Sequence, residues 1–261
     1  MSLFDVSGRV AVITGSSRGI GRAAAERLAE HGAKVVISSR KFDACKAVAD
    51  EINARHGSET ALAIAANISS KEDLANLVTQ TRESFGKIDI LVCNAATNVH
   101  FGSMSTITDE QFRKILDNNI ISTHWLIQLV APEMVARRDG AIVIVSSVGG
   151  LQGSGLLGAY SISKAADFQL ARNLAVELGP HNVRINCVAP GIIKTDFAKA
   201  LWQNPAIAKG TEEATPLRRL GDPDDVAGAV VFFSAPASRH ITGQNIVIDG
   251  GAIVGGSSSL L

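Results

Sequence analysis

The sequence predicts a single-domain α/β fold, in which a doubly wound parallel sheet of about seven strands carries helices on both faces. Short apolar runs alternate with longer amphipathic stretches along the chain, a pattern typical of repeated strand–helix–strand units. A chain of 261 residues is long enough to bury a large core. No repeat or linker divides residues 1–261, apart from a glycine- and serine-rich tail at 255–259. We therefore expect one domain.

The elements follow from apolar periodicity and from the residues that end each run. Gly32 ends the first helix, Ser69 or Ser70 caps the third, and Asp222, followed by proline, caps the last. The predicted strands span 9–13, 34–38, 61–65, 88–92, 141–145, 183–188 and 245–248. The predicted helices span 20–31, 43–55, 71–85, 159–178 and 223–234, together with a region at 109–137 that breaks near 117–119.

Composition and charge exclude several classes of function. The chain has 25 basic and 25 acidic residues and no basic run, which argues against nucleic-acid binding. Cys45, Cys93 and Cys187 are far apart and form no metal-ligand pattern, so we expect reduced thiols in a cytoplasmic protein and no metal site. No signal pattern or membrane-length apolar run is present. The final residues 259–261 loosely resemble a peroxisomal address, which would apply only in a eukaryote.

A glycine-rich turn, Thr14-Gly15-Ser16-Ser17-Arg18-Gly19-Ile20-Gly21, joins the first predicted strand to the first helix. Glycines let a pyrophosphate approach the backbone, and a helix N-terminus offers free N–H groups and partial positive charge. This context predicts a dinucleotide site and therefore a Rossmann fold. The residues assigned to it are Gly15, Ser17, Arg18, Ile20 and Gly21.

The end of the second strand indicates which dinucleotide binds. NAD sites usually place a carboxylate there to bond the ribose 2′-hydroxyl, whereas a 2′-phosphate requires positive charge. This chain has Ser39 at that position, followed by Arg40, while Arg18 lies in the phosphate turn. The pattern favours NADP. NAD stays possible, because Arg40 and Lys41 at a strand end can simply face solvent.

The only tyrosine, Tyr160, precedes Lys164 by four residues. On a helix this spacing puts both side chains on one face. A neighbouring ammonium lowers the pKa of a phenol, which titrates near pH ~10 in isolation. Such a phenol can give a proton to a carbonyl oxygen or take one from an alcohol. An ordinary tyrosine before a surface lysine has the same spacing, so other motifs must decide.

Further motifs are Asn94-Ala95-Ala96, Asn119, Ser147 and Pro190-Gly191. Together with the glycine-rich turn and the Tyr160–Lys164 pair, they resemble the short-chain dehydrogenase/reductase family in order and spacing, over essentially the whole chain. Residues 94–103 and 189–202 are most similar to its tropinone-reductase-like and NADPH carbonyl reductase branch, of the dehydrogenase/reductase member 4 type. Two positions depart from the family pattern, with Ala96 in place of a glycine and Asn67 in place of an aspartate that bonds adenine.

The resemblance implies four catalytic residues. Tyr160 would be the general acid in ketone reduction and the base in alcohol oxidation, and Lys164 would lower its pKa. Ser147 would donate a hydrogen bond to the substrate oxygen. The amide of Asn119 would hold a water that links Lys164 to solvent.

The resemblance also assigns cofactor contacts beyond the phosphate turn and implies a homotetramer, assembled through long helices and the last strand. These contacts are Ser39, Arg40, Asn67, Ile68, Asn94, Ala95, Ala96, Tyr160, Lys164, Pro190, Gly191, Ile193 and Thr195.

We therefore expect an NADP(H)-dependent oxidoreductase that reversibly reduces a small-molecule ketone or aldehyde under a lid at about 195–220. No arginine is positioned by the sequence for a carboxylate, which favours a neutral substrate. Alternatives are an NAD-linked secondary-alcohol, polyol, steroid or 3-oxoacyl dehydrogenase, or a non-catalytic NADP(H) sensor. The apolar residues expected around the substrate are Val148, Leu151, Leu156, Leu157, Phe197, Leu201 and Trp202.

Overall fold

The computed structural model describes residues 2–255, so most of the predicted tail and the 259–261 motif lie outside the described residues. All seven strands pair in parallel in one sheet, with the order β3-β2-β1-β4-β5-β6-β7. The strands are β1 (Val10–Thr14), β2 (Lys34–Ser39), β3 (Ala61–Ala65), β4 (Ile90–Cys93), β5 (Gly140–Val145), β6 (Val183–Pro190) and β7 (Asn245–Ile248).

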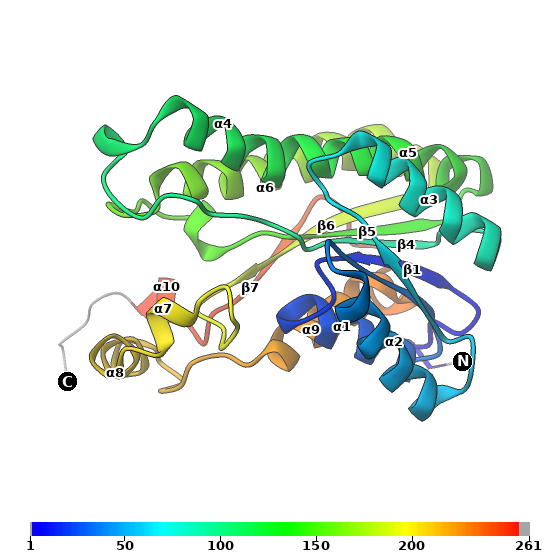
Figure 1. The fold of residues 1–261 in the computed structure, drawn as a ribbon, viewed down its shortest axis with the longest axis horizontal. Coiled ribbons are helices and arrows are strands. Elements are labelled where there is room, and N and C mark those ends of the chain that lie inside the picture. The colour runs from blue at the N-terminus through cyan, green and yellow to red at the C-terminus, as the bar shows by residue number, and fades with distance from the viewer. Residues whose placement is uncertain (1, 256–261) are drawn as a thin grey trace.

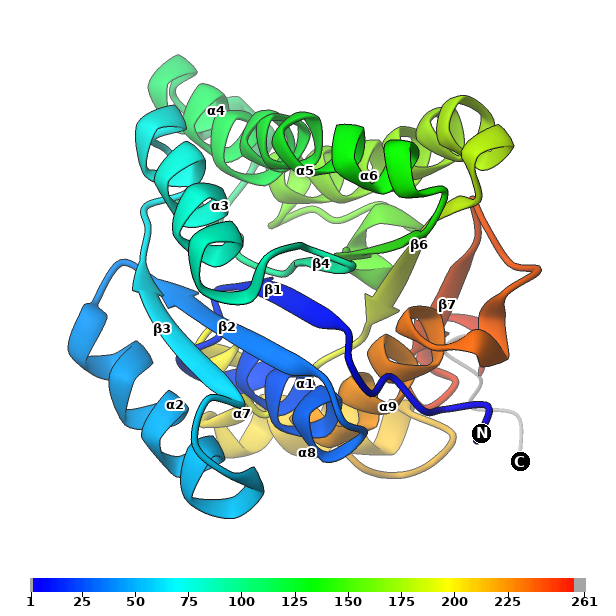
Figure 2. The ribbon, with the colours of Figure 1, turned by 90° about the vertical axis from the view of Figure 1, so that its right-hand side faces the viewer.

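Helices cover both faces of this sheet (Figures 1 and 2). One face carries α1 (Gly19–Glu30), α2 (Phe42–His56) and α9 (Pro223–Ser234). The other carries α3 (Lys71–Phe85), α4 (Asp109–Leu116), α5 (Ser122–Arg137) and α6 (Gly158–Leu178). Shorter helices are α7 (Lys199–Trp202), α8 (Pro205–Ala214) and α10 (Ala252–Gly255). The predicted doubly wound α/β fold is confirmed, and predicted and observed strand ends agree within two residues.

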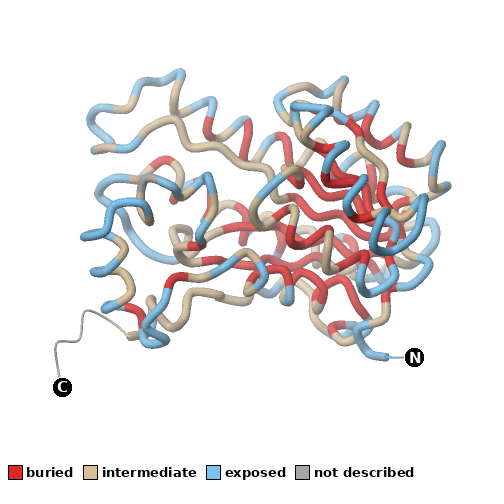
Figure 3. Tube along the Cα trace, turned by 60° about the horizontal axis from the view of Figure 1, so that its bottom comes forward, coloured by how far each residue is buried: buried red, intermediate tan, exposed pale blue. Residues whose placement is uncertain are grey.

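The core consists of two apolar clusters, one on each side of the sheet. Every residue of β1, β4 and β5 is buried, as expected for parallel strands covered by helices on both faces. Figure 3 shows the buried segments gathered along the strands and the inner sides of the helices. The rigid sheet therefore fixes the positions of the loops that leave its carboxyl edge.

Two features differ from the sequence-based expectation. The 109–137 region forms two α-helices that meet near 117–119, as expected, but their junction is a π-helical turn, Asp117–Ile121, which keeps the chain helical between α4 and α5. The 195–220 stretch is not irregular throughout, because it contains α7 and α8. The asparagine pair suggested a helix end, but both side chains are buried and bonded within the fold, which stabilises the wider turn.

The sheet order reverses between β1 and β4. Strands β2 and β3 lie on one side of β1, and strands β4 to β7 lie on its other side. In an open parallel sheet this reversal leaves a crevice at the carboxyl ends of the two strands, where ligands bind. The loops after β1 and β4 are the glycine-rich turn and the Asn94 segment, so two sequence motifs meet there.

Candidate active site

The glycine-rich turn is tightly packed against the segment after β4. Gly15 and Gly19 have φ values of +66° and +58°, which favour glycine. A Cβ on Gly15 would lie 2.9 Å from Asn94 Nδ2, and one on Gly21 would lie 2.6 Å from the Gly15 carbonyl oxygen. Side chains are therefore excluded on the side where the backbone bends into α1. Half-buried Ser17 lies in the turn.

Asn94 holds this turn in place. Its Nδ2 donates to the carbonyl oxygens of Thr14 at 2.9 Å and Gly15 at 3.1 Å. The Thr14 hydroxyl oxygen in turn accepts from the backbone N–H groups of Asn94 and Ala95, both at 3.1 Å. Thr14 was part of the motif but was not predicted as a site residue; its position at the end of a buried strand was the available signal. Ala96 continues this segment toward Asn119.

The residues expected to select the dinucleotide lie beside the same turn. Thr14 pairs with Ser38 in the sheet register, so Ser39 and exposed Arg40 follow directly at the adjacent strand end. Arg18 is also exposed, and its Nη1 lies 3.0 Å from Asp196 Oδ2. The structure therefore leaves the Arg40 side chain exposed at the end of β2, whereas the Arg18 guanidinium is directed to the Asp196 carboxylate.

The next strand end brings Asn67 and Ile68 to the same edge. Ser39 pairs with Ala65 in the register, two residues before Asn67. The Asn67 side-chain oxygen accepts from Ser69 N at 3.2 Å, while half-buried Ile68 packs against the core. On the other side of the turn, Ile20 at the start of α1 packs against the opposite core cluster.

Asn119 lies in the π-helical turn, where its side chain is 2% exposed. Its Nδ2 donates to the Thr97 carbonyl oxygen and to Ser163 Oγ, both at 3.0 Å. Its Oδ1 accepts from Thr97 N at 2.8 Å. Both amide protons are therefore used to tie the segment after β4 to α6. A water molecule bound to this side chain can therefore only donate a hydrogen bond to the remaining lone pair of Oδ1.

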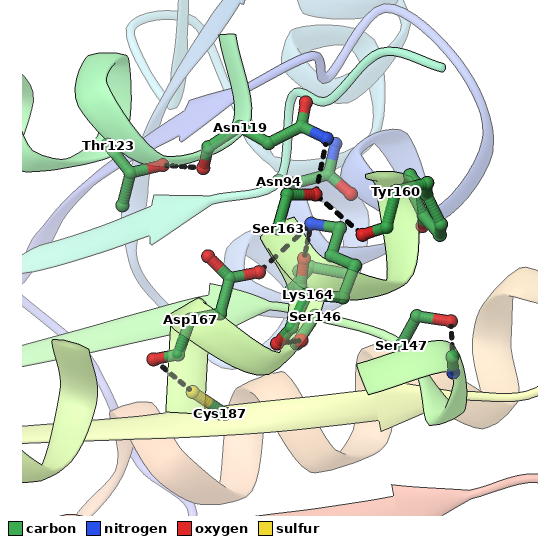
Figure 4. A network of polar contacts seen from close by, with 12 residues as sticks. Asn94, Asn119, Thr123, Ser146, Ser147, Tyr160, Ser163, Lys164, Asp167 and Cys187 are labelled. Atoms are coloured by element: carbon green, nitrogen blue, oxygen red, sulfur yellow. Dashed lines mark hydrogen bonds and ion pairs between the residues drawn. The ribbon is translucent and has the colours of Figure 1, made fainter. Parts of the chain in front are cut away.

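Tyr160, Lys164 and Ser147 meet between α6 and the end of β5 (Figure 4). Lys164 Nζ lies 5.7 Å from the Tyr160 ring centroid. A Cβ on Gly149 would lie 3.4 Å from Ser147 Oγ and 3.9 Å from Tyr160 Cε1, so these two residues flank one glycine. A Cβ on Gly150 would lie 2.5 Å from the Lys164 backbone, and its absence allows the turn after β5 to approach α6 this closely.

Burial and charge act in opposite directions on this pair. Burial raises the pKa of Tyr160, and it outweighs the lowering by the Lys164 ammonium and the Ser147 hydroxyl. Lys164 therefore lowers the pKa of Tyr160, as expected. The sum of all effects nevertheless raises that pKa, which the sequence did not predict. Burial lowers the pKa of Lys164 itself, but the Asp167 carboxylate and Tyr160 raise it further, so the lysine stays charged.

Asp167 was not predicted as a site residue. Its Oδ2 lies 3.1 Å from Lys164 Nζ, which also donates to the Val145 carbonyl oxygen at 2.9 Å. The sequence did hold a signal, because Tyr160, Lys164 and Asp167 occupy positions i, i+4 and i+7 of one helix and so share a face.

A cleft of about 310 Å³ lies at the carboxyl edge of β6 and β7. Gly191 and Ile193 line it, directly after Pro190 at the end of β6. Thr195 follows, and its Cγ2 would lie 3.2 Å from a Cβ on Gly19, so this loop reaches the phosphate turn. Among the predicted apolar residues Val148 lines the cleft, and the Phe197 ring lies 6.0 Å from that of Tyr160.

These residues fit a nicotinamide dinucleotide. The glycine-rich bend packs too closely on Asn94 to admit a Cβ at Gly15 or Gly21, and it leads directly into the N-terminus of α1, where free N–H groups suit a pyrophosphate. From there the predicted contacts follow the carboxyl edge of the sheet to Tyr160. Residues 2–255 hold no group of three or more His, Cys, Asp or Glu side chains suited to a metal, and no helix in that range is long and apolar enough to cross a membrane.

Comparison with known proteins decides the family. A family model described as enoyl-(acyl carrier protein) reductase matches residues 15–252. The chain is 42% identical over 246 residues to dehydrogenase/reductase SDR family member 4 from Mus musculus, covering 94% of this chain and 88% of that protein. The chain belongs to the short-chain dehydrogenase/reductase family. It is therefore an oxidoreductase of the NAD(P)-binding type, as the motifs indicated.

Two solved structures of this family differ in cofactor. A gluconate 5-dehydrogenase from Burkholderia cenocepacia, in complex with NADP and tartrate, is 27% identical with a TM-score of 0.91, covering 96% of this chain and 97% of that one. A 7α-hydroxysteroid dehydrogenase complexed with NADH and 7-oxo glycochenodeoxycholic acid is 36% identical with a TM-score of 0.90, covering 95% and 96%. Family membership therefore does not fix the dinucleotide.

Proposed function

We propose that this protein is an NADP(H)-dependent oxidoreductase that reversibly reduces a ketone or aldehyde to an alcohol. The observation that carries the proposal is the meeting of Tyr160, Lys164 and Ser147 between α6 and the end of β5, at the carboxyl edge of the sheet. Together these groups offer a transferable proton, a fixed positive charge and a hydroxyl, which supports the proposal. These groups suit proton transfer to a carbonyl oxygen.

In the reducing direction, Tyr160 donates its phenolic proton to the carbonyl oxygen. NADPH, when bound, supplies the hydride that the carbonyl carbon accepts. The raised pKa of Tyr160 keeps the phenol protonated at neutral pH, which suits reduction better than oxidation. The Ser147 hydroxyl donates to the same substrate oxygen as negative charge develops there. Lys164 stabilises the phenolate that remains after proton transfer.

The preference for NADP rests on Arg40 and Arg18, with Ser39 in place of a carboxylate. A guanidinium binds phosphate with charge-assisted, often bidentate hydrogen bonds. Arg18 pairs with Asp196, but both side chains are more than half exposed, and such pairs contribute only ~0–1 kcal/mol. A 2′-phosphate competes effectively for Arg18 at that strength.

The substrate is a neutral carbonyl compound. The cleft is lined mainly by apolar and small residues, and its one guanidinium, Arg219, makes two hydrogen bonds to Asp225 at 2.6 and 2.8 Å. An arginine already paired with a carboxylate is a poor partner for a substrate carboxylate. Residues 195–220 act as the lid, since Phe197 lies against the Tyr160 ring and Trp202 Nε1 donates to the Thr195 carbonyl oxygen at 2.7 Å.

Stopped-flow mixing of the protein–NADPH complex with a panel of neutral ketones and aldehydes tests the proposal. We expect loss of NADPH absorbance at a rate that depends on the ketone. Tight NADPH binding with no oxidation by any ketone in the panel would instead support a sensor.

A second candidate is an NAD-linked secondary-alcohol or steroid dehydrogenase. The similarity to the NADH-bound 7α-hydroxysteroid dehydrogenase favours it. The ratio of kcat/KM for NADPH to that for NADH separates the two. A ratio of one or below would favour NAD and would remove the argument from Arg40.

The assembly and compartment are also proposals. We infer a homotetramer, since α6 leaves the apolar side chains of Ile162, which is 47% exposed, and Val176, which is 80% exposed, on its outer face. Light scattering at micromolar concentration tests this, and a monomeric mass would contradict it. We place the protein in the cytoplasm on the basis of its three buried, unpaired cysteines.

A further inference from the structure

Asp167 is the most completely buried charged residue of the site. It is 0% exposed, and Lys164 beside it is 3% exposed. Asp167 Oδ2 accepts from Lys164 Nζ, whereas Oδ1 has no hydrogen-bond partner among residues 2–255. The neighbouring Ser146 hydroxyl donates instead to the Lys164 backbone carbonyl oxygen, at 2.8 Å. Lys164 is therefore the main partner of the carboxylate, and the nearby Ser146 hydroxyl adds a smaller lowering of the Asp167 pKa.

Burying such a carboxylate is unfavourable for the free energy of folding. Moving a charged group out of water costs several kcal/mol even after relaxation, and a half-satisfied polar group is worse than an apolar one. Around Asp167, Tyr160 and Lys164 lie on the same helix, and the two nearby thiols belong to Cys93 on β4 and Cys187 on β6. Burial raises the pKa of both thiols, so they stay neutral.

Lys164 depends on this carboxylate in return. Its ammonium makes hydrogen bonds to the neutral Val145 carbonyl oxygen and to Asp167, and only the latter carries charge. A buried ammonium without a counter-charge tends to lose its proton. We propose that Asp167 is a positioning residue for the reaction, which keeps Lys164 charged and holds its Nζ between α6 and the end of β5.

The proposal makes a prediction about Tyr160 that has a definite sign. Asp167 acts directly on Tyr160 by raising its pKa, and indirectly by keeping charged the lysine that lowers it. The lysine contribution is the larger of the two. If Asp167 acts through Lys164, removing its charge must therefore raise the pKa of Tyr160. If Asp167 acts only directly on Tyr160, removing the Asp167 charge must lower the pKa of Tyr160.

The single tyrosine makes this measurable without cofactor, because tyrosinate absorbance in the near ultraviolet reports Tyr160 alone. We expect Asp167→Asn to move the tyrosinate transition to higher pH. Asp50→Asn, which breaks the exposed Lys46–Asp50 pair, is the matched control and should leave the transition unchanged. Far-ultraviolet circular dichroism at each pH identifies the range over which the fold persists.

A Lys164→Met background tests whether the effect passes through the lysine. In that background only the direct effect of Asp167 on Tyr160 remains, and this effect raises the Tyr160 pKa, so Asp167→Asn should lower the transition or leave it unchanged. An unchanged or lower transition on Asp167→Asn in the otherwise native chain would overturn the proposal. An equal upward shift with and without Lys164 would also overturn it.

If the Asp167→Asn variant does not fold, Asp167→Ser replaces it in the tyrosinate titration, since serine is smaller and carries no charge. The consequence for turnover rests on the proposed function: we expect a loss of about 10-fold to 100-fold in kcat for ketone reduction, with a changed pH profile. The two ideas fail separately. Absence of any NADPH turnover would refute the function and leave the tyrosinate test intact, while a wrong-signed titration in an active enzyme would refute only the role of Asp167.

Discussion

Replacing Tyr160 by phenylalanine removes one hydroxyl group and keeps the ring. The ring contacts, 6.0 Å to the Phe197 centroid and 5.7 Å to Lys164 Nζ, survive the change. We therefore expect the free energy of unfolding to change by less than about 1 kcal/mol and NADPH binding to persist. What is lost is the proton that the carbonyl oxygen must receive.

The size of the loss follows from the absence of a substitute acid. Lys164 Nζ is turned toward the Val145 carbonyl oxygen and Asp167, and Ser147 Oγ accepts from Gly149 N at 3.1 Å. General acid catalysis contributes about 100-fold to 10,000-fold. We expect kcat for ketone reduction to fall within that range, which is about 2.7 to 5.5 kcal/mol in the barrier.

The assay is single-turnover oxidation of bound NADPH by a ketone, which isolates the chemical step from product release. The matched control is Ser161→Ala, which removes a hydroxyl from the next residue of α6; this hydroxyl is buried and has no hydrogen-bond partner. That variant should keep native activity and be no less stable. A loss smaller than about 10-fold for Tyr160→Phe would refute its role as the acid.

Three further predictions follow from the same geometry. Because burial raises the Tyr160 pKa, the rate of ketone reduction should stay constant through neutral pH and fall as the pH rises through the Tyr160 pKa. The rate of alcohol oxidation should increase over the same range, and the opposite pair of pH profiles would contradict this prediction. Arg40→Ala should lower kcat/KM for NADPH about 10-fold and leave that for NADH nearly unchanged, with Lys41→Ala as the control; equal losses would count against a 2′-phosphate contact. Gly21→Ala should abolish NADPH binding in a fluorescence titration, since the new Cβ would lie 2.6 Å from the Gly15 carbonyl oxygen in the phosphate turn. Gly228→Ala is the control: a Cβ there meets nothing within 4 Å, so thermal unfolding should show a free energy of unfolding higher by up to about 1 kcal/mol.

The regular elements were predictable because their signals are local. A strand such as Ala61–Ala65 is a short apolar run between polar segments, and the cap at Ser70 is a single side chain that accepts from Asp73 N three residues later. The π-helical turn was not predictable in this way. Its buried asparagines form hydrogen bonds with Thr97, Ser163 and Ser69, which are far away in sequence.

The site residues show the same division between what local sequence signals predict and what depends on tertiary contacts. The family motifs named Tyr160, Lys164, Ser147 and Asn119, since their types and spacing are fixed along the chain. The net direction of the Tyr160 pKa was missed, because it depends on how deeply the ring is buried. Asp167 was missed because an aspartate on a helix is usually a solvated one.

By itself, then, the sequence determined the order of strands and helices and the glycine-rich bend, and it named Tyr160 as the proton donor that we propose. Only the tertiary structure decided where the charges are balanced, because burial and electrostatic interaction depend on distances between segments that are remote along the chain. It placed the Asn119 amide between α6 and the segment after β4, and it enclosed Lys164 with a single carboxylate partner.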